Sequence, residues 1–238
     1  DLTIDAPVNP TWNGESTIEW DVEVENTGRV QETVDLTVSP RSGSGCKSDG
    51  SMSIDVSPSS VQIDNGSSEW VTVTLQVPDG KESDKYCWEI EGVVTNDQNP
   101  NGSASDTEEF SLFVPELKKC DASLTKSSLS LNPGETGTLV ATFSNQGNTD
   151  WSINVGFNGS KSNWVSVDGP SSGNLPYENG NGEKEFTIEV TPDDSVEANS
   201  QNSIYIEGKD GNLWKCRQQI TVTVGQSRGA SMSLGNTV

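Results

Sequence analysis

Apolar and polar residues alternate with a period of two along nearly the whole chain, and no stretch has the 3.6-residue period of an amphipathic helix. A period of two is typical of β-strands with one buried face. Gly, Pro, Asn and Asp separate the alternating runs, as turn residues do between short strands. The pattern predicts an all-β protein with strands near residues 2–4, 20–24, 34–38, 70–77, 86–94, 110–114, 129–131, 139–143, 153–157, 164–167, 186–190, 204–206 and 220–224.

The two halves of the chain repeat one pattern, which indicates a duplicated domain. Several short strands per half, joined by turn residues, are typical of antiparallel β-sandwiches. We therefore predict two tandem Ig-like β-sandwich domains, at residues 1–115 and 116–225, followed by a tail at 226–238. The matching segments, offset by 119, 114 and 116 residues, are 20–24 with 139–143, 77–79 with 191–193, and 88–92 with 204–208.

Asn-x-Gly occurs at the same place in each half, at Asn26-x-Gly28 and Asn145-x-Gly147. Both lie between two strand-like runs. Asn and Gly tolerate the positive φ of tight turns, so we interpret the pair as two turns of a duplicated scaffold without a binding role.

Charge argues against two classes of partner. The chain has 14 basic and 36 acidic residues and no histidine, for a formal net charge of −22. Such a surface repels phosphates and anionic headgroups, so neither nucleic acid nor direct membrane insertion is expected. Two explanations of the acidity stay open. It favours solubility, or it reflects adaptation to high salt in an archaeon or its virus, where screening relieves self-repulsion.

The four cysteines, two in each half, predict disulfides and an oxidising compartment. No Cys-x-x-Cys spacing and no histidine are present to build a zinc site. The split between halves selects Cys46–Cys87 and Cys120–Cys216 among the three connectivities, each stabilising by about 3 to 4.5 kcal/mol. Asn-Gly-Ser sequons, which agree with export and predict a glycoprotein, stand at Asn65, Asn101 and Asn158.

These segments resemble Ig-like modules of bacterial and archaeal surface proteins. The first half, with DLTIDAP and WDVEVENTGRVQETVDLTV, is similar to CARDB-type modules. The second, with SLSLNPGETGTLVATFSNQGNTDW, NWVSVDGPSSGNL and EFTIEVTPDD, resembles BACON-like modules, although Gly169 is inserted in the V-S-V-x-P-S-S-G pattern. The resemblance implies a spacer, adhesion or ligand-binding module without catalysis.

The residues offer little for catalysis. Gly169-Pro-Ser171-Ser-Gly173 fits a nucleophile elbow, but the chain has no histidine base, and we interpret the segment as a loop. The acids could supply a glycosidase pair, yet many occupy every second strand position, as in residues 19–25, which is typical of a solvated face. We predict no catalytic residue, no cofactor and no enzymatic activity.

Calcium is a weaker alternative for the acidic residues. Asp193, Asp194 and Glu197 cluster oxygen ligands, as does the loop at residues 97–101, although neither has EF-hand spacing. Extracellular modules bind calcium weakly through such groups.

The seven tryptophans divide into two sets. Those in phase with inward positions, or at the start of a strand, are expected in the core: Trp20, Trp70, Trp88 and Trp164. The others lie in or beside turns, where they either anchor loops or stack on sugar rings: Trp12, Trp151 and Trp214.

The tail alternates again at Ala230, Met232 and Leu234, which suggests either a disordered end or a strand that adds to a neighbouring subunit. Our leading hypothesis is an extracellular structural or adhesive protein of a surface layer, filament, appendage or viral spike, which associates with itself or with other surface proteins. The alternative is a carbohydrate-binding accessory module of a larger secreted enzyme.

Overall fold

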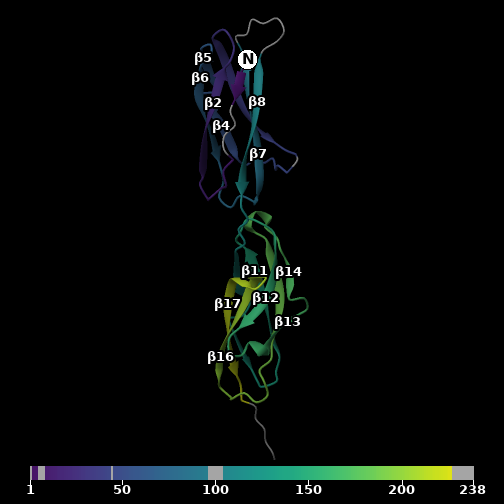
Figure 1. Ribbon diagram of the computed structural model, residues 1–238. Helices are drawn as coiled ribbons and strands as arrows, with labels where there is room; N and C mark the ends of the chain where they lie inside the picture. Colours follow the sequence, from purple (N-terminus) through teal and green to yellow (C-terminus); the bar gives the residue numbers. More distant parts are fainter. Residues whose placement is uncertain (1, 5–8, 44, 96–103, 227–238) are drawn as a thin grey trace, which may run out of the picture. The chain divides into compact units, whose positions relative to one another are not determined.

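The computed structural model divides into two compact units, residues 1–116 and 117–238. Both units are built from β-strands, with two single-turn 3₁₀ helices in the second, Ser162–Trp164 and Glu178–Gly180 (Figure 1). The prediction of two tandem antiparallel β-sandwiches is confirmed. The described residues are 2–4, 9–43, 45–95 and 104–226.

Unit 1 has two four-stranded sheets. Their orders are β1-β2-β6-β4 and β5-β3-β7-β8. They correspond to the ABED and CFG sheets of an immunoglobulin domain, with one extra edge strand beside the second. The strands are β1 Leu2–Ile4, β2 Thr17–Asn26, β3 Glu32–Arg41, β4 Ser53–Ser57, β5 Ser60–Ile63, β6 Ser68–Gln76, β7 Asp84–Val94 and β8 Ser105–Val114.

Unit 2 repeats this topology. Its sheets have the orders β13-β15-β11-β9 and β10-β17-β16-β12-β14, and β10 runs parallel to β17. In unit 1 Thr11 forms a parallel bridge to Phe113 on β8, which is the counterpart of that parallel pair. The strands are β9 Cys120–Leu124, β10 Ser128–Leu131, β11 Gly137–Asn145, β12 Trp151–Asn158, β13 Val165–Asp168, β14 Ser172–Leu175, β15 Glu183–Val190, β16 Gln201–Asp210 and β17 Leu213–Val224.

The chain changes sheet at equivalent places in the two units. In unit 1, β4 pairs with β6 in one sheet, and β5, two residues later, pairs with β3 in the other. In unit 2, β13 pairs with β15, and β14 pairs with β12. Residues 169–171 of the Gly169–Gly173 segment connect β13 to β14 across this change of sheet, and Ser172 and Gly173 begin β14, so the segment is no strand-to-helix turn.

Each unit has its own apolar core. Trp20, Trp88 and Phe110 stack in unit 1, with ring centroids 5.2 and 5.9 Å apart. In unit 2 Phe143 and Phe186 meet edge to face at 5.8 Å, and Trp164 is buried in the same cluster. Three of the four tryptophans expected in the core are therefore there.

Trp70 is the exception, because its side chain is 60% exposed. On β6 the buried positions are Val71, Val73 and Leu75, so the alternation places residue 70 on the outer face. The prediction took residue 70 to be in phase with the inward positions, whereas Val71, Val73 and Leu75 set the opposite phase.

Each unit also has one disulfide, between the cysteines expected to pair. Cys46, in the loop after β3, bonds Cys87 on β7. Cys120 on β9 bonds Cys216 on β17 and so links the two sheets of unit 2. The described residues contain no free cysteine. Among these residues no helix is long and apolar enough to cross a membrane.

The expectation that Asn26 and Asn145 stand in turns because of a positive φ is wrong. Both are fully buried, and neither they nor Gly28 and Gly147 have a positive φ. Each Asn Oδ1 accepts the backbone N–H of the following glycine, at 2.8 and 2.9 Å. The glycine at 147 is required by a close approach instead, because a Cβ there would lie 1.9 Å from the carbonyl oxygen of Leu117.

Candidate functional site

The outer face of β12, β16 and β17 in unit 2 gathers exposed aromatic, cationic and amide side chains. Along β16, Ile204, Ile206 and Gly208 are buried, so the alternate residues Tyr205, Glu207 and Lys209 belong to the outer face. Their partners across the sheet complete the face. These pairs are Asn158 with Tyr205, Gly156 with Glu207, Glu207 with Arg217, and Lys209 with Trp214.

A β-bulge places Trp214 on this face. Trp214 and Arg217 are three residues apart, and a regular strand would put them on opposite sides of the sheet. The register shifts between Gly208 and Lys209, so that Cys216 pairs with Gly208 while Trp214 pairs with Lys209. The extra residue turns Trp214 outward, where its side chain is 58% exposed.

Arg217 joins the two aromatic rings of the face. Its guanidinium carbon lies 4.8 Å from the centroid of the Tyr205 ring and 5.2 Å from that of Trp214. Both distances suit a cation–π contact. Among the described residues no carboxylate lies within 4.0 Å of Arg217, so its charge has no ion-pair partner there.

Glu207 anchors the polar part of the face. It is 3% exposed, accepts a hydrogen bond from Asn158 Nδ2 at 3.2 Å, and forms an ion pair with Lys209 at 3.0 Å. The Lys209 side chain lies across Gly156, where a Cβ would be 2.6 Å from its terminal atoms. The glycine thus makes room for the lysine to reach Glu207.

Of the three tryptophans expected as glycan contacts, only Trp214 is well placed. Trp151 is 3% exposed and belongs to the core of unit 2. Trp12 packs against the core of unit 1, and its indole N–H donates to the carbonyl of Glu15 at 2.7 Å. A residue beside a turn can still point inward when it is the first of a strand, as Trp151 is.

The residues proposed for calcium are not gathered into a site. Asp193 Oδ2 accepts the indole N–H of Trp164 at 2.8 Å, so this carboxylate stabilises the core tryptophan. The described residues contain no group of three or more acidic or cysteine side chains arranged for a metal. Asp194 and Glu197 are exposed nearby, and residues 97–101 lie outside the described residues.

Two shallow cavities of unit 1 have little of what a hydrolase needs. One, of about 330 Å³, is lined by serines, Gln76 and a single carboxylate, Asp79. The other, of about 190 Å³, lies beside the first disulfide and contains Glu109 and Lys85. Each holds one carboxylate, whereas glycoside hydrolysis requires a pair.

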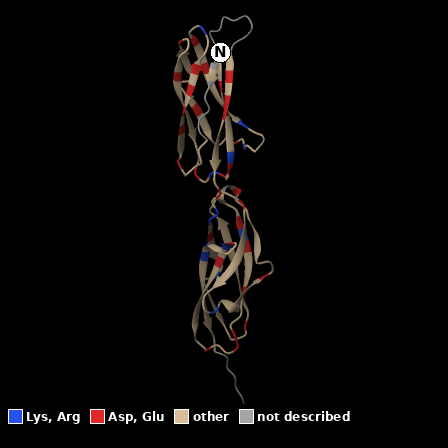
Figure 2. Cartoon of the chain, viewed as in Figure 1, with Lys and Arg blue, Asp and Glu red and all other residues tan. Residues whose placement is uncertain are grey.

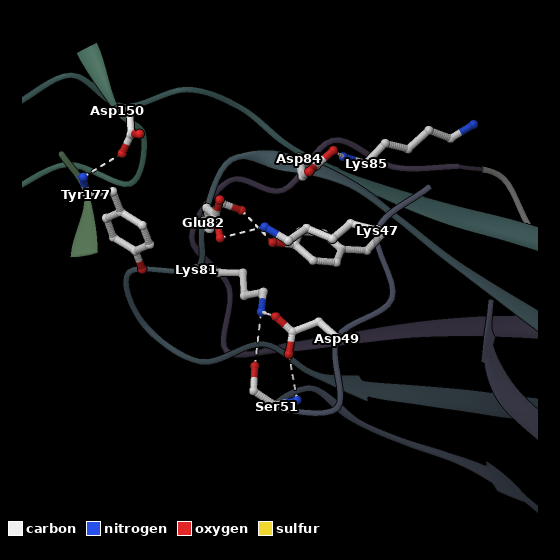
Figure 3. Close-up of polar contacts among 10 residues, drawn as sticks. Lys47, Asp49, Ser51, Lys81, Glu82, Asp84, Lys85, Asp150 and Tyr177 are labelled. Atoms are coloured by element: carbon white, nitrogen blue, oxygen red, sulfur yellow. Dashed lines mark hydrogen bonds and ion pairs between the residues drawn. The ribbon is translucent and has the colours of Figure 1, made fainter. Parts of the chain in front are cut away.

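A buried ion pair lies at one end of unit 1 (Figure 3). The ammonium of Lys81, whose side chain is 6% exposed, pairs with Asp49 and hydrogen-bonds Ser51 Oγ at 3.0 Å. It also lies 4.8 Å from the centroid of the Tyr86 ring. Burial, and then the ammonium of Lys47, lower the pKa of Lys81.

A second, more exposed pair accompanies it. Lys47 Nζ lies 2.6 Å from Glu82 Oε2, and the hydroxyl of Tyr86 donates to the Glu82 carbonyl at 2.8 Å. These contacts connect the loop after β3 with the loop before β7. The two ion pairs, Lys47–Glu82 and Lys81–Asp49, therefore hold these loops together.

The acidic charge is concentrated in unit 1 (Figure 2). Residues 1–116 contain 23 acidic and 5 basic residues, whereas residues 117–238 contain 13 acidic and 9 basic ones. Much of the excess lies on the outer face of β2, where Glu19, Asp21, Glu23 and Glu25 alternate with buried residues. The expected solvated acidic face is confirmed.

Two of the three sequons are described. Asn65 lies exposed in the turn before β6, and Asn158 is exposed at the end of β12. Asn101 lies outside the described residues, as do residues 227–238 of the tail. Glycosylation and strand donation remain predictions.

Most of the outer face was missed from the sequence. Tyr205, Glu207 and Lys209 were readable as alternate positions of a strand, but their pairing with Asn158 and Arg217 depends on the sheet order. No residue pattern in the sequence predicts the β-bulge beside Gly208.

Comparisons with known proteins give no functional assignment. No family model matches the chain, and no curated protein matches it. Solved structures resemble it at low TM-scores. A Porphyromonas gingivalis protein of unknown function is 14% identical over 94% of this chain and 99% of its own, with a TM-score of 0.37.

Two further similar structures belong to a pilus system and to an S-layer protein. The CsuC–CsuE chaperone–tip adhesion subunit complex of Acinetobacter baumannii is 17% identical over 95% of this chain and 100% of that chain, with a TM-score of 0.35. Domains 4 and 5 of the S-layer protein SbsC are 15% identical over 74% of this chain and 72% of that chain, with a TM-score of 0.34. Likenesses this distant support no inference about activity.

Proposed function

We propose that the chain is a non-enzymatic, extracellular structural or adhesive protein of a surface layer, filament, appendage or viral spike. One observation carries the proposal: each of the two β-sandwich units has its own disulfide, and every described cysteine is paired. Disulfides persist in oxidising compartments and are rare in reducing ones.

The rest of the molecule agrees with this role. The strongly acidic residues of unit 1, such as those on the outer face of β2, favour solubility and oppose non-specific association. The described cavities hold single carboxylates, and the most elaborate side-chain arrangement is an open sheet face suited to contact. Its partners are further copies of the chain or other surface proteins.

Immunogold electron microscopy of intact cells or particles from the source tests the proposal. We expect gold on the outer surface, arranged along a layer or appendage, without permeabilisation. Labelling that requires permeabilisation would reject it. Light scattering of the full chain against a chain lacking residues 226–238 tests strand donation, and equal assembly by the two would reject that part alone.

A further inference from the structure

We propose that the outer face formed by Tyr205, Glu207, Trp214 and Arg217 binds the pyranose rings of an uncharged polysaccharide. This gives the adhesive role proposed above a ligand class and rests on it. The face lies on a hydrogen-bonded sheet and combines an exposed ring with polar groups.

Trp214 provides the stacking surface. Its side chain is 58% exposed, and a pyranose can lay its C–H face on such a ring while its hydroxyls stay hydrated or hydrogen-bonded. Arg217 lies 5.2 Å from the ring and limits its movement, so less conformational entropy is lost on binding. The bulge beside Gly208 is what turns the ring outward.

The hydrogen-bonding groups belong to the same sheet face as the ring. Arg217 presents a planar fork of N–H donors with no carboxylate within 4.0 Å in the described part of the chain. Asn158, cross-strand from Tyr205, uses its Nδ2 on Glu207, which orients the amide. Donors and an amide carbonyl on the same face as an exposed aromatic ring suit the hydroxyl groups of a sugar chain.

Charge favours an uncharged ligand. Residues 117–238, which contain this face, have 13 acidic and 9 basic residues, and this net negative charge disfavours polyanions such as uronic acid polymers. The Lys209 ammonium, which could otherwise attract an anion, is already paired with Glu207 at 3.0 Å.

Exposure alone does not distinguish Trp214, because Trp70 is exposed to a similar extent. It is 60% exposed in unit 1, yet its partner across the strands is Glu23, and no ring or cation stacks on it among the described residues. The two tryptophans are matched in exposure and differ in their surroundings, which makes Trp70 the control.

The experiment is affinity electrophoresis of the full chain in gels that contain xyloglucan, mannan, galactan or mixed-linkage β-glucan, with alginate as the acidic comparison. Isothermal titration follows for any polysaccharide that retards the protein. Four proteins are compared: the unchanged chain, Trp214→Ala, Arg217→Lys and Trp70→Ala. Circular dichroism and the thermal transition confirm that each variant is folded.

We expect at least one neutral polysaccharide to bind the unchanged chain and Trp70→Ala equally. Trp214→Ala should weaken binding about tenfold or more, and Arg217→Lys should weaken it less, because lysine keeps the charge but loses the planar stack. The inference is overturned if no neutral polysaccharide binds, if alginate alone binds, or if both tryptophan variants behave alike. If the protein lies on the outer surface but binds no polysaccharide, this inference is rejected and the proposed function stands. If the protein binds polysaccharide but is intracellular, the proposed function is rejected and the binding face stands.

Discussion

The side-chain amide of Asn26 donates to the carbonyl oxygen of Ile63, 37 residues further along the chain, at 3.1 Å. The same nitrogen donates to Val30 in the turn, at 2.8 Å. In unit 2 Asn145 makes the equivalent contacts to Thr149 and to Leu175, the last residue of β14. A single buried amide thus closes the turn and fastens the strand that has changed sheet.

Replacing Asn26 with alanine should therefore destabilise unit 1 strongly. The change removes two donors and one acceptor and leaves backbone groups buried without partners, which costs about 2 to 4 kcal/mol. Urea unfolding followed by tryptophan fluorescence measures it. Asn65→Ala, at an exposed asparagine, is the control and should leave the midpoint unchanged. A midpoint for Asn26→Ala equal to that of the control would contradict the prediction.

Reduction of the disulfides should weaken both units, and unit 2 slightly more. The bridges close loops with sequence separations of 41 and 96 residues. On the chain-entropy model these separations correspond to about 4 and about 4.7 kcal/mol. Denaturant unfolding of the single-bridge variants Cys46→Ser/Cys87→Ser and Cys120→Ser/Cys216→Ser assigns the loss to each unit. Equal stability with and without reductant would be the contrary result.

Salt should stabilise unit 1 more than unit 2. The first unit has an excess of 18 acidic over basic residues and the second an excess of 4, so mutual repulsion is concentrated in the first. Raising NaCl from about 0.1 to about 1 M shortens the Debye length from about 10 to about 3 Å and screens that repulsion. Calorimetry should show the transition of unit 1 moving upward by more than that of unit 2. Equal shifts would indicate a general solvent effect instead.

Asp49→Asn should cost about 1 to 3 kcal/mol, because it removes the carboxylate that pairs directly with the buried Lys81 ammonium. The neighbouring pair is a matched control. Glu82→Gln breaks a contact to Lys47 whose side chains are 34% and 45% exposed, and exposed pairs contribute about 0.2 to 1 kcal/mol. A double-mutant cycle with Lys81→Met isolates the coupling. A cost no larger than that of Glu82→Gln would show that burial adds nothing to the pair.

The strands were predictable because burial alternates along them. Val71, Val73 and Leu75 of β6, like Ile204 and Ile206 of β16, occupy alternate positions and are buried. Trp70 was placed wrongly because the phase of this strand was taken from residue 70 and not from Val71, Val73 and Leu75.

The candidate site was largely out of reach of the sequence. It depends on which strands are neighbours and on a bulge that shifts Trp214 by one residue relative to β16. The sequence repeat at Asn26 and Asn145 was found, but its role was interpreted wrongly. Both side chains hydrogen-bond backbone groups 30 or more residues away, and the sequence does not distinguish such an asparagine from one in a simple turn. The burial of Trp151 was not predictable from the sequence either. Trp151 follows Asn145 by six residues, as Glu32 follows Asn26. Both side chains are buried, and each has one polar atom without a hydrogen-bond partner among the described residues.

The uneven distribution of acids has a consequence for how the chain attaches to other material. A cationic surface, such as an ion-exchange resin or a basic polymer, attracts residues 1–116 far more strongly than residues 117–238. Adsorption to such a surface should therefore occur through residues 1–116, whose acidic excess is 18 against 4 in residues 117–238.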